Sequence, residues 1–315
     1  MLPDTVELDQ LNLVRSCAYL VFDEREGLSS TPDVIRKSVT GLPRDPPLAA
    51  FGEAHGCVQA QAQELADYFL SLPEDQRPTA IFSSPFYRCL QTSQPTAKAL
   101  GLPIHIEHAI GEWYSPVVPN TGLLHPRPGP PSSLVQYFPE IDTTAWPSSL
   151  WYPSRKGETI EELHDRVAGF LALLPQALAR RPDIDARRVL FVSHAATAIA
   201  LVRQLLGDKE LPLKYGCCAL SELELKPGAS GEQPLGAYTA VKLADGGHMK
   251  EGAAREWGFS DVEVEKGRVR GCGVSAMGIA DAVVLLKVVE DPGELGSDVE
   301  EDFPVGPQMH ILSNL

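Results

Sequence analysis

Apolar residues recur at helical spacing in two clear stretches of the chain. The first covers about residues 57–72, and Pro73 closes it. The second begins after Thr159, which forms a capping box with Glu162, a typical helix start. Its apolar face contains Ile160, Leu163, Val167, Phe170, Leu171 and Leu174. Both stretches therefore predict amphipathic helices that cover a core.

Two short, almost continuous apolar runs predict buried strands at 79–84 and 189–193. A helix-like stretch follows each run, and Gly101 and Gly207 end these two helices. Further strand-like segments are 11–14, 18–22, 104–110, 217–225 and 238–243. Alternation of strands and helices is typical of an α/β fold whose sheet is mostly parallel.

Residues 116–153 break this pattern, because they contain nine prolines and little periodicity. Proline removes a backbone donor and disfavours helix at the residue before it. A connection of this length without regular structure is usually a functional lid or insertion. We therefore expect a long excursion over the edge of the sheet.

The composition is that of a folded protein, with 43% hydrophobic and 22% charged residues. The net charge is −15, and the chain from Val288 onward holds seven acidic residues and no Lys or Arg. This balance disfavours direct binding to nucleic acid or to an anionic membrane. No apolar run approaches a membrane span, and the start lacks a basic leader region, so we expect an intracellular protein, cytoplasmic or nuclear. The six cysteines lack metal-site spacing, and we expect them to be reduced.

Three residues with chemical potential follow predicted strands. Arg88, just past 79–84, could grip a phosphate, and His194, after 189–193, could donate to an oxyanion beside a helix N-terminus. Glu112 has Trp113 beside it, and an apolar neighbour would raise its pKa and keep it protonated as a general acid. Each has an ordinary alternative: a surface arginine, a core histidine or a solvated glutamate.

The motifs around these residues resemble the histidine phosphatase superfamily, the phosphoglycerate mutase-like proteins. The resemblance spans about residues 41–225. It rests on Ser83-Ser84-Pro85-Phe86-Tyr87-Arg88-Cys89-Leu90-Gln91-Thr92, Gly111-Glu112-Trp113, Lys156-Gly157-Glu158-Thr159 with Arg166, and Val192-Ser193-His194-Ala195. It implies an α/β fold, a three-layer sandwich with a mostly parallel central sheet. We expect this domain over residues 1–260 and a C-terminal extension with an acidic, flexible tail over 261–315.

The resemblance also implies a mechanism. In this family a histidine of an Arg-His-Gly motif after the first strand attacks phosphorus, and the resulting phosphohistidine is hydrolysed. Arg88 and His194 would then bind phosphate, and Glu112 and His194 would be catalytic. No metal or organic cofactor is implied. The partner would be a phosphorylated small molecule or a phosphoprotein, whose identity the sequence leaves open, while Glu158 and Arg166 are interpreted as structural.

The chain departs from the family at the nucleophile, because it contains no Arg-His-Gly. Arg15-Ser16-Cys17 follows one strand-like segment, and Phe22 with polar residues follows the other. His55 follows a Pro-rich loop rather than a strand, and Cys17 lacks the loop of cysteine phosphatases. Three hypotheses remain open: a phosphatase acting through phosphohistidine, a pseudophosphatase that keeps the phosphate pocket, and a subunit of a larger complex.

Three segments look like additions to a more regular chain: 22–36, 55–60 and 270–287. A translated intron would produce such insertions, and the first could have replaced the stretch that holds Arg-His-Gly. Divergence into a catalytically dead protein is the alternative. Sequencing of the transcript distinguishes the two.

Overall fold

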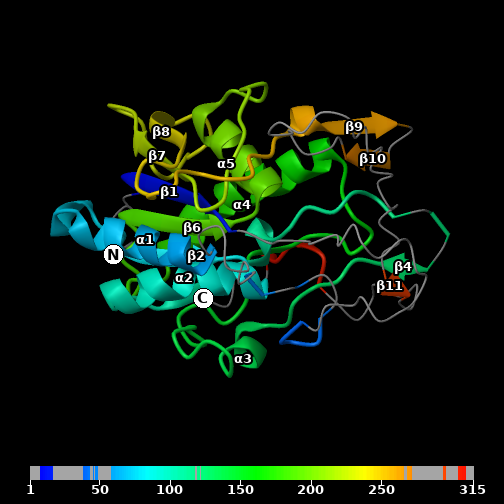
Figure 1. Ribbon diagram of the computed structural model, residues 1–315, viewed down its shortest axis with the longest axis horizontal. Helices are drawn as coiled ribbons and strands as arrows, with labels where there is room; N and C mark the ends of the chain where they lie inside the picture. Colours follow the sequence, from blue (N-terminus) through cyan, green and yellow to red (C-terminus); the bar gives the residue numbers. More distant parts are fainter. Residues whose placement is uncertain are drawn as a thin grey trace.

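A six-stranded sheet forms the centre of the protein, in the order β3-β2-β6-β1-β7-β8 (Figure 1). The structure, a computed structural model, describes residues 8–16, 38–42, 45, 47–48, 58–117, 119–120, 122–265, 268–271, 294–295 and 304–309. The strands of the sheet are β1 (Gln10–Arg15), β2 (Ala80–Ser83), β3 (Ile104–Ile106), β6 (Arg188–Ser193), β7 (Leu220–Leu225) and β8 (Tyr238–Asp245). β3, β2, β6 and β1 pair in parallel, and β7 is antiparallel to both β1 and β8. The expectation of a mostly parallel sheet is confirmed.

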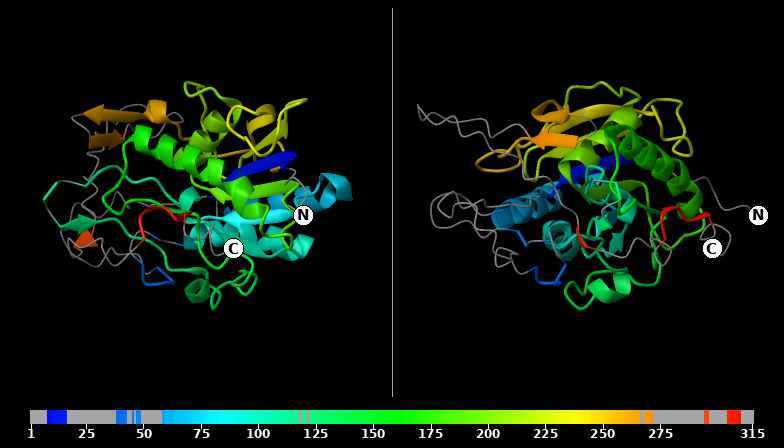
Figure 2. Two further views of the ribbon diagram at one scale, coloured as in Figure 1. Left: turned by 180° about the vertical axis from the view of Figure 1, so that it is seen from behind. Right: turned by 90° about the vertical axis from the view of Figure 1, so that its right-hand side faces the viewer.

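Helices cover both faces of this sheet. The long helices are α1 (Val58–Ser71), α2 (Tyr87–Leu100), α4 (Ile160–Leu178) and α5 (Ala195–Leu206). Alternate residues of β6 belong to different cores: Leu190 and Val192 pack with residues of α1 and α2, whereas Val189 and Phe191 pack with residues of α4 and α5. The result is the three-layer sandwich, with β1 in dark blue running between the helical layers (Figures 1 and 2).

The local signals in the sequence set the helix ends. Thr159 accepts from the backbone N–H of Glu162, and the Glu162 side chain accepts from the N–H of Thr159, so the predicted capping box is present. Gly101 and Gly207 end α2 and α5 with φ of 65° and 76°, in the left-handed region that glycine adopts without strain. Among the described residues, no helix has the length and apolar character needed to cross a membrane.

The Pro-rich excursion contains only short elements, as expected for residues 116–153. They are β4 (Leu123–Leu124), α3 (Pro131–Leu134) and β5 (Trp151–Tyr152). Other short elements are η2 (Glu74–Gln76), η3 (His108–Ile110), η4 (Phe259–Asp261), and the hairpin of β9 (Val262–Glu265) and β10 (Arg268–Gly271).

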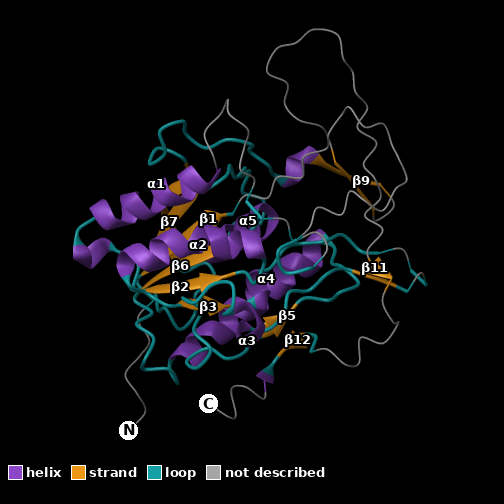
Figure 3. Ribbon diagram, turned by 60° about the horizontal axis from the view of Figure 1, so that its bottom comes forward, coloured by secondary structure: helices purple, strands orange, loops and turns teal. Residues whose placement is uncertain are grey.

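Two short segments of the C-terminal extension pair with this excursion. β11 (Glu294–Leu295) is antiparallel to β4, and β12 (Gly306–Pro307) is antiparallel to β5 (Figure 3). The sequence predicts a solvated acidic tail, but these described residues pack on the domain.

Several sequence-based expectations fall partly or wholly outside the described residues. The strand-like segment 18–22, the apparent insertion 22–36, and the residues Cys17 and His55 all lie there. Of the apparent insertion 55–60, the last three residues form the start of α1, and of 270–287 only the first two are described, at the end of β10. Cys89 and Cys218 are free thiols, whereas Cys217 is disulfide-bonded, so the expectation of reduced cysteines is wrong at that position.

Glu107 ties the Pro-rich excursion to the end of β3. Its buried carboxylate accepts from the backbone N–H groups of Ala109 and Leu150, each at 2.9 Å, from that of Trp151 at 3.4 Å and from the Trp146 indole at 3.3 Å. Burial raises the pKa of Glu107 to about 7, and these N–H donors oppose the increase. This carboxylate therefore helps to fix the excursion to the end of β3.

Replacing Glu107 by glutamine should lower the free energy of unfolding by about 1–3 kcal/mol, because the new amide N–H₂ faces N–H donors and leaves them without an acceptor. Urea unfolding monitored by circular dichroism measures this change. Glu232→Gln, an isosteric change at an exposed position, is the control. A Glu107→Gln protein as stable as the control would contradict the anchoring role of this carboxylate.

Candidate functional site

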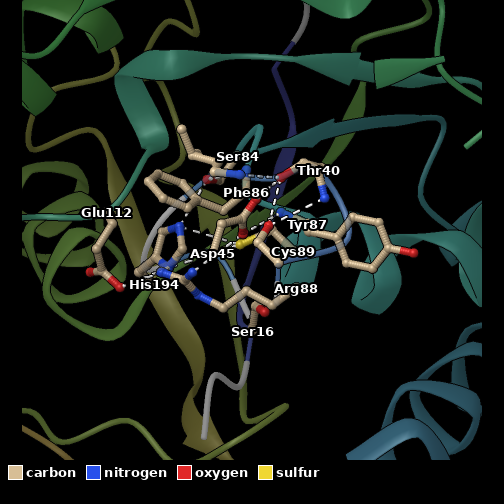
Figure 4. Close-up of polar contacts among 12 residues, drawn as sticks. Ser16, Thr40, Asp45, Ser84, Phe86, Tyr87, Arg88, Cys89, Glu112 and His194 are labelled. Atoms are coloured by element: carbon tan, nitrogen blue, oxygen red, sulfur yellow. Dashed lines mark hydrogen bonds and ion pairs between the residues drawn. The ribbon is translucent and has the colours of Figure 1, made fainter. Parts of the chain in front are cut away.

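Arg88, Glu112 and His194 meet at one point, although they are far apart in the sequence (Figure 4). Nη2 of Arg88 donates to Oε2 of Glu112 at 2.8 Å, and Nδ1 of His194 lies 3.0 Å from the same oxygen. Nη2 of Arg88 is 3.2 Å from Nδ1 of His194. The sequence places each residue after a separate strand, and the structure brings all three together.

The parallel strands explain this convergence. Arg88 lies in the first turn of α2, just after β2, and His194 is the N-cap of α5, directly after β6. Glu112 follows η3, which comes after β3. Because β2, β3 and β6 run in the same direction, their carboxyl ends lie at one edge of the sheet, where ligands bind in open α/β folds.

His194 is a buried, neutral imidazole. Burial lowers its pKa to about 4, and the Glu112 carboxylate only partly opposes that decrease. Nε2 of His194 lies 2.8 Å from the Ser84 hydroxyl, whose oxygen also accepts from the backbone N–H of Phe86 at 3.5 Å. Since a neutral ring has one N–H, the network assigns the proton to Nδ1, facing Glu112, and Ser84 donates to Nε2.

Glu112 differs from the sequence-based expectation. Burial alone would raise its pKa, but the interactions with His194 and with the charged Arg88, including a hydrogen bond from each, outweigh burial and hold the pKa well below the usual range. The expectation of a protonated Glu112 beside an apolar neighbour is therefore wrong for this arrangement, because the indole of Trp113 is directed to the carbonyl of Glu158 instead. The carboxylate lies between the two groups that would hold a phosphate.

Asp45 is a site residue that the sequence analysis missed. Its carboxylate lies 3.6 Å from Nη1 of Arg88 and accepts from the backbone N–H of Tyr87 at 2.8 Å. Burial raises the pKa of Asp45 to about 6, and the positive charge of Arg88 opposes this increase. A lone aspartate in a Pro-rich loop carries no sequence signal, and only the fold brings it to α2. Arg88 is thus held between two carboxylates, Asp45 and Glu112.

The end of β1 supplies the other missed residues, Arg15 and Ser16. Arg15 aligns with Ser193 across the β1–β6 pair, and the Ser16 N–H donates to the Ser193 carbonyl at 2.7 Å. Ser16 therefore lies beside His194 on the neighbouring parallel strand. It is 3% exposed, and Thr92 donates to its hydroxyl at 3.3 Å. The structure thus selects the first of the two strand-like segments as β1, and Arg15-Ser16 follows that strand where the family's Arg-His is expected.

Arg15 is anchored in the wall of the site. Nη1 of Arg15 donates to the carbonyl of Tyr215 and, at 2.7 Å, to that of Arg255. Burial lowers its pKa to about 10, while the charge of Glu112 raises it and that of Arg88 lowers it. Since Arg15 stands beside Ser193 across the β1–β6 pair, it adds a further positive charge at this edge of the sheet.

Glu158 and Arg166 form a buried ion pair behind the site. Nε of Arg166 lies 2.9 and 3.0 Å from the two carboxylate oxygens of Glu158, and Nη2 lies 2.8 Å from one of them. Nη1 of Arg166 donates to the carbonyl of Ala109. The pair links α4 to the segment that leads into Glu112, in keeping with the structural interpretation of both residues.

A pocket opens next to Glu112 on the side of the Pro-rich excursion. Its lining includes Phe86, Glu112, Tyr114, His125, Arg127 and Arg155. The ring of Phe86 lies 4.6 Å from the Arg88 guanidinium and 5.2 Å from the His194 ring. Phe86 and Glu112 therefore separate this pocket from the buried cluster of Arg88 and His194.

Comparison with known families agrees with this geometry. The family model of the histidine phosphatase superfamily (branch 1) matches residues 37–231. The chain belongs to the histidine phosphatase superfamily. The resemblance predicted from the sequence motifs is confirmed, while the expected domain boundary at residue 260 stays a prediction.

Several known proteins are similar to parts of this chain. The transcription factor tau 55 kDa subunit of Saccharomyces cerevisiae is 39% identical over 197 residues, which are 59% of this chain and 42% of that protein. The chain thus spans less than half the length of this relative. The ecdysone phosphate phosphatase of Bombix mori, solved with tungstate, is 17% identical, covering 75% of this chain and 93% of its own, with a TM-score of 0.49. A mycobacterial glucosyl-3-phosphoglycerate phosphatase, also 17% identical, covers 74% of this chain and 98% of its own, with a TM-score of 0.42.

Proposed function

We propose that this protein is a pseudophosphatase: a module that binds a phosphoryl group but does not form phosphohistidine. The observation that carries the proposal is Ser16. It stands at the carboxyl end of β1, beside His194, where the superfamily places the nucleophilic histidine after its arginine. A serine hydroxyl in that place cannot form a phosphohistidine. Among the described residues, the Ser16 hydroxyl lies 3.3 Å from that of Thr92, which is not a general base.

The remaining groups favour binding of a phosphate. Arg88 presents a guanidinium that stays charged at any working pH and matches phosphate oxygens in a bidentate fashion. The Nδ1–H of His194 points at the same centre, and Arg15 adds positive charge nearby. The carboxylate of Glu112 now occupies this centre, 2.8 Å from Arg88 and 3.0 Å from His194. A phosphate would displace this carboxylate and take over its contacts.

The competing hypothesis is a phosphomonoesterase, and it is favoured by the presence of Arg88, His194 and Glu112 in one cluster. Incubation of the purified protein with a generic phosphomonoester distinguishes the two. No turnover, together with binding of inorganic phosphate in calorimetry, supports the pseudophosphatase. Turnover that is lost in Arg88→Ala supports the enzyme and contradicts the proposal.

Glu112→Gln gives the two hypotheses opposite outcomes. In a binding module the substitution removes the negative charge of Glu112 from the phosphate position. The phosphate and this carboxylate are both negative, and such charges repel by several kcal/mol at contact distance when they are partly buried. The Glu112→Gln protein should therefore bind phosphate about tenfold more tightly. In an enzyme it removes the general acid, and turnover should fall. Calorimetry with inorganic phosphate and a phosphomonoester assay measure the two effects, with Glu232→Gln as control. Unchanged phosphate affinity in Glu112→Gln would contradict the position that we assign to this carboxylate.

We also propose that the protein works as a subunit of a larger complex, and that it acts in the nucleus. The support is its similarity to the yeast protein named as a transcription factor subunit. In that role the phosphate site would recognise a phosphorylated partner protein rather than turn over a metabolite. Size-exclusion chromatography of the tagged protein from its own cells tests this: a single, monomer-sized peak would contradict it.

A further inference from the structure

The backbone that leads into Glu112 is held by two hydroxyl groups, one from β6 and one from α5. The hydroxyl of Ser193, at the end of β6, donates to the carbonyl of Ile110 at 2.7 Å. The hydroxyl of Thr197, in the first turn of α5, donates to the carbonyl of Gly111 at 2.8 Å. Both Ser193 and Thr197 are buried. The two carbonyls that directly precede Glu112 are therefore fixed from inside the protein.

The direction of the Thr197 hydroxyl connects this backbone to His194. A threonine in a helix commonly donates to a carbonyl three or four residues earlier in the same helix. The hydroxyl of Thr197 is instead directed to Gly111, which follows η3 in a distant part of the chain. His194 is the N-cap of the same helix, three residues before Thr197. The start of α5 thus carries both the imidazole that faces Glu112 and a group that fixes the Glu112 backbone.

The turn before Glu112 is also tightly packed. The N–H of Gly111 donates to the carbonyl of His108 at 2.9 Å, and a Cβ atom at position 111 would lie 2.9 Å from that carbonyl oxygen. The buried Arg166 donates to the carbonyl of Ala109. The three consecutive carbonyls 109–111 are therefore all held by side chains, and the backbone enters Glu112 from a fixed position.

The carboxylate of Glu112 occupies the contacts that a phosphate would use. Its Oε2 lies 2.8 Å from Nη2 of Arg88 and 3.0 Å from Nδ1 of His194. The side chain is 26% exposed and lines the neighbouring pocket, so it has space outside these contacts. A group that is held in place in advance loses less conformational freedom when it makes its contacts. The more firmly the backbone is fixed, the more strongly this carboxylate competes with a ligand.

We propose that Ser193 and Thr197 are positioning residues that hold the Glu112 carboxylate at the phosphate position, and thereby set how strongly it competes with a phosphate. The inference rests on the proposed function, because it requires a phosphate that displaces this carboxylate. Both hydroxyls act through the backbone of Ile110 and Gly111. Removing either hydroxyl should loosen Glu112 and favour the ligand.

Thr197→Val tests the proposal, because valine has the shape of threonine but lacks the donor. We expect this variant to bind inorganic phosphate about threefold more tightly in calorimetry, as the loss of one net hydrogen bond allows. Ser193→Ala should have an effect in the same direction. Thr197→Ser keeps the hydroxyl and should bind phosphate as the unmodified protein does.

Thr96→Val is the matched control. Thr96 is also buried, lies about two turns beyond Arg88 in α2, and its hydroxyl has no hydrogen-bond partner among the described residues. This variant should leave the phosphate affinity unchanged. A gain in Thr96→Val as large as that in Thr197→Val would overturn the inference, since the contact with Gly111 would then not be the cause.

A double-mutant cycle shows whether the effect passes through Glu112. In a Glu112→Gln background no negative charge competes with phosphate, so adding Thr197→Val should leave the affinity unchanged. A merely structural role of Thr197 would change the affinity equally in both backgrounds. An equal change in both, or no gain from Thr197→Val when Glu112 is present, overturns the inference.

A second readout needs no phosphate. In the unliganded protein the Nδ1–H of His194 faces the Glu112 carboxylate, and the NMR resonance of this proton moves downfield as that hydrogen bond strengthens. Thr197→Val and Ser193→Ala should shift the resonance upfield, whereas Thr96→Val should not. An unchanged resonance overturns the positioning role. Absence of phosphate binding by the unmodified protein overturns the proposed function and the competition, and the resonance then decides whether the hydroxyls position Glu112.

Discussion

Replacing Arg88 by alanine is expected to weaken the binding of inorganic phosphate by about 100-fold. The guanidinium would form two charge-assisted hydrogen bonds to phosphate oxygens, and their loss corresponds to about 3 kcal/mol. Arg88 is buried, with 3% of its surface exposed. An arginine on the water-exposed surface could not take over its contacts with the phosphate, and the effect is therefore large. Isothermal titration calorimetry at low salt measures the change.

A second variant separates binding from folding. Arg88→Ala leaves the buried Asp45 without its cation, which is itself destabilising. Arg88→Lys keeps the charge but loses the fork of donors, and we expect a loss of about tenfold in phosphate affinity with a smaller loss of stability. If Arg88→Lys folds and binds phosphate as the unmodified protein does, Arg88 is not the phosphate ligand, and the proposed function fails.

The second large effect is a gain of activity. The double variant Ser16→His, Cys17→Gly re-creates Arg-His-Gly after β1, with Arg15 already in place. The new imidazole would stand beside His194 and next to Arg88, where a phosphohistidine could form. We expect phosphomonoester turnover to increase from background to at least about 100-fold above it, as expected when a covalent pathway becomes accessible.

Two controls make this gain specific. Ser16→Ala makes room without adding a nucleophile and should remain inactive. Adding Arg88→Ala to the active variant should remove its turnover, because the phosphoryl group would lose its clamp. A folded double variant that binds phosphate and stays inactive would mean that Ser16 does not occupy the place of the nucleophile. Since Ser16 is buried, a melting temperature for each variant accompanies the assay.

Together the two experiments test a single physical idea, that phosphate binding and phosphoryl transfer are separable in this fold. Binding depends on fixed positive charge, supplied here by Arg88 and Arg15 near a neutral His194. Transfer depends on one nucleophilic atom at the end of β1. Under our proposal this chain lacks that atom but keeps the charges, and a ligand would replace the Glu112 carboxylate that lies against Arg88.

The sequence predicted the regular part of the fold because its signals are local. Periodicity located α1, the capping box at Thr159 located the start of α4, and the apolar run ending at Ser193 located β6. Because strands that end in polar residues place those residues at one edge of a parallel sheet, the meeting of Arg88, Glu112 and His194 was also predictable. The superfamily motifs around these residues pointed to the same site.

The tertiary structure decided what depends on contacts between distant segments. The hydrophobic pattern of the first sixty residues is compatible with a first strand at 11–14 or at 18–22. In the structure β1 is Gln10–Arg15, because this segment pairs with both β6 and β7. The tertiary structure also set the ionisation of Glu112, since burial acts in one direction and the interactions with Arg88 and His194 in the other, and only the distances determine which prevails. Asp45 reaches Arg88, and the segment 304–309 reaches β5, only through folding, as neither has a sequence signal of its own. The sequence by itself thus determined the layers, the strand ends and the residues that converge. The choice of β1 and the charge balance of the site were decided by packing, because both depend on distances between segments that local patterns do not encode.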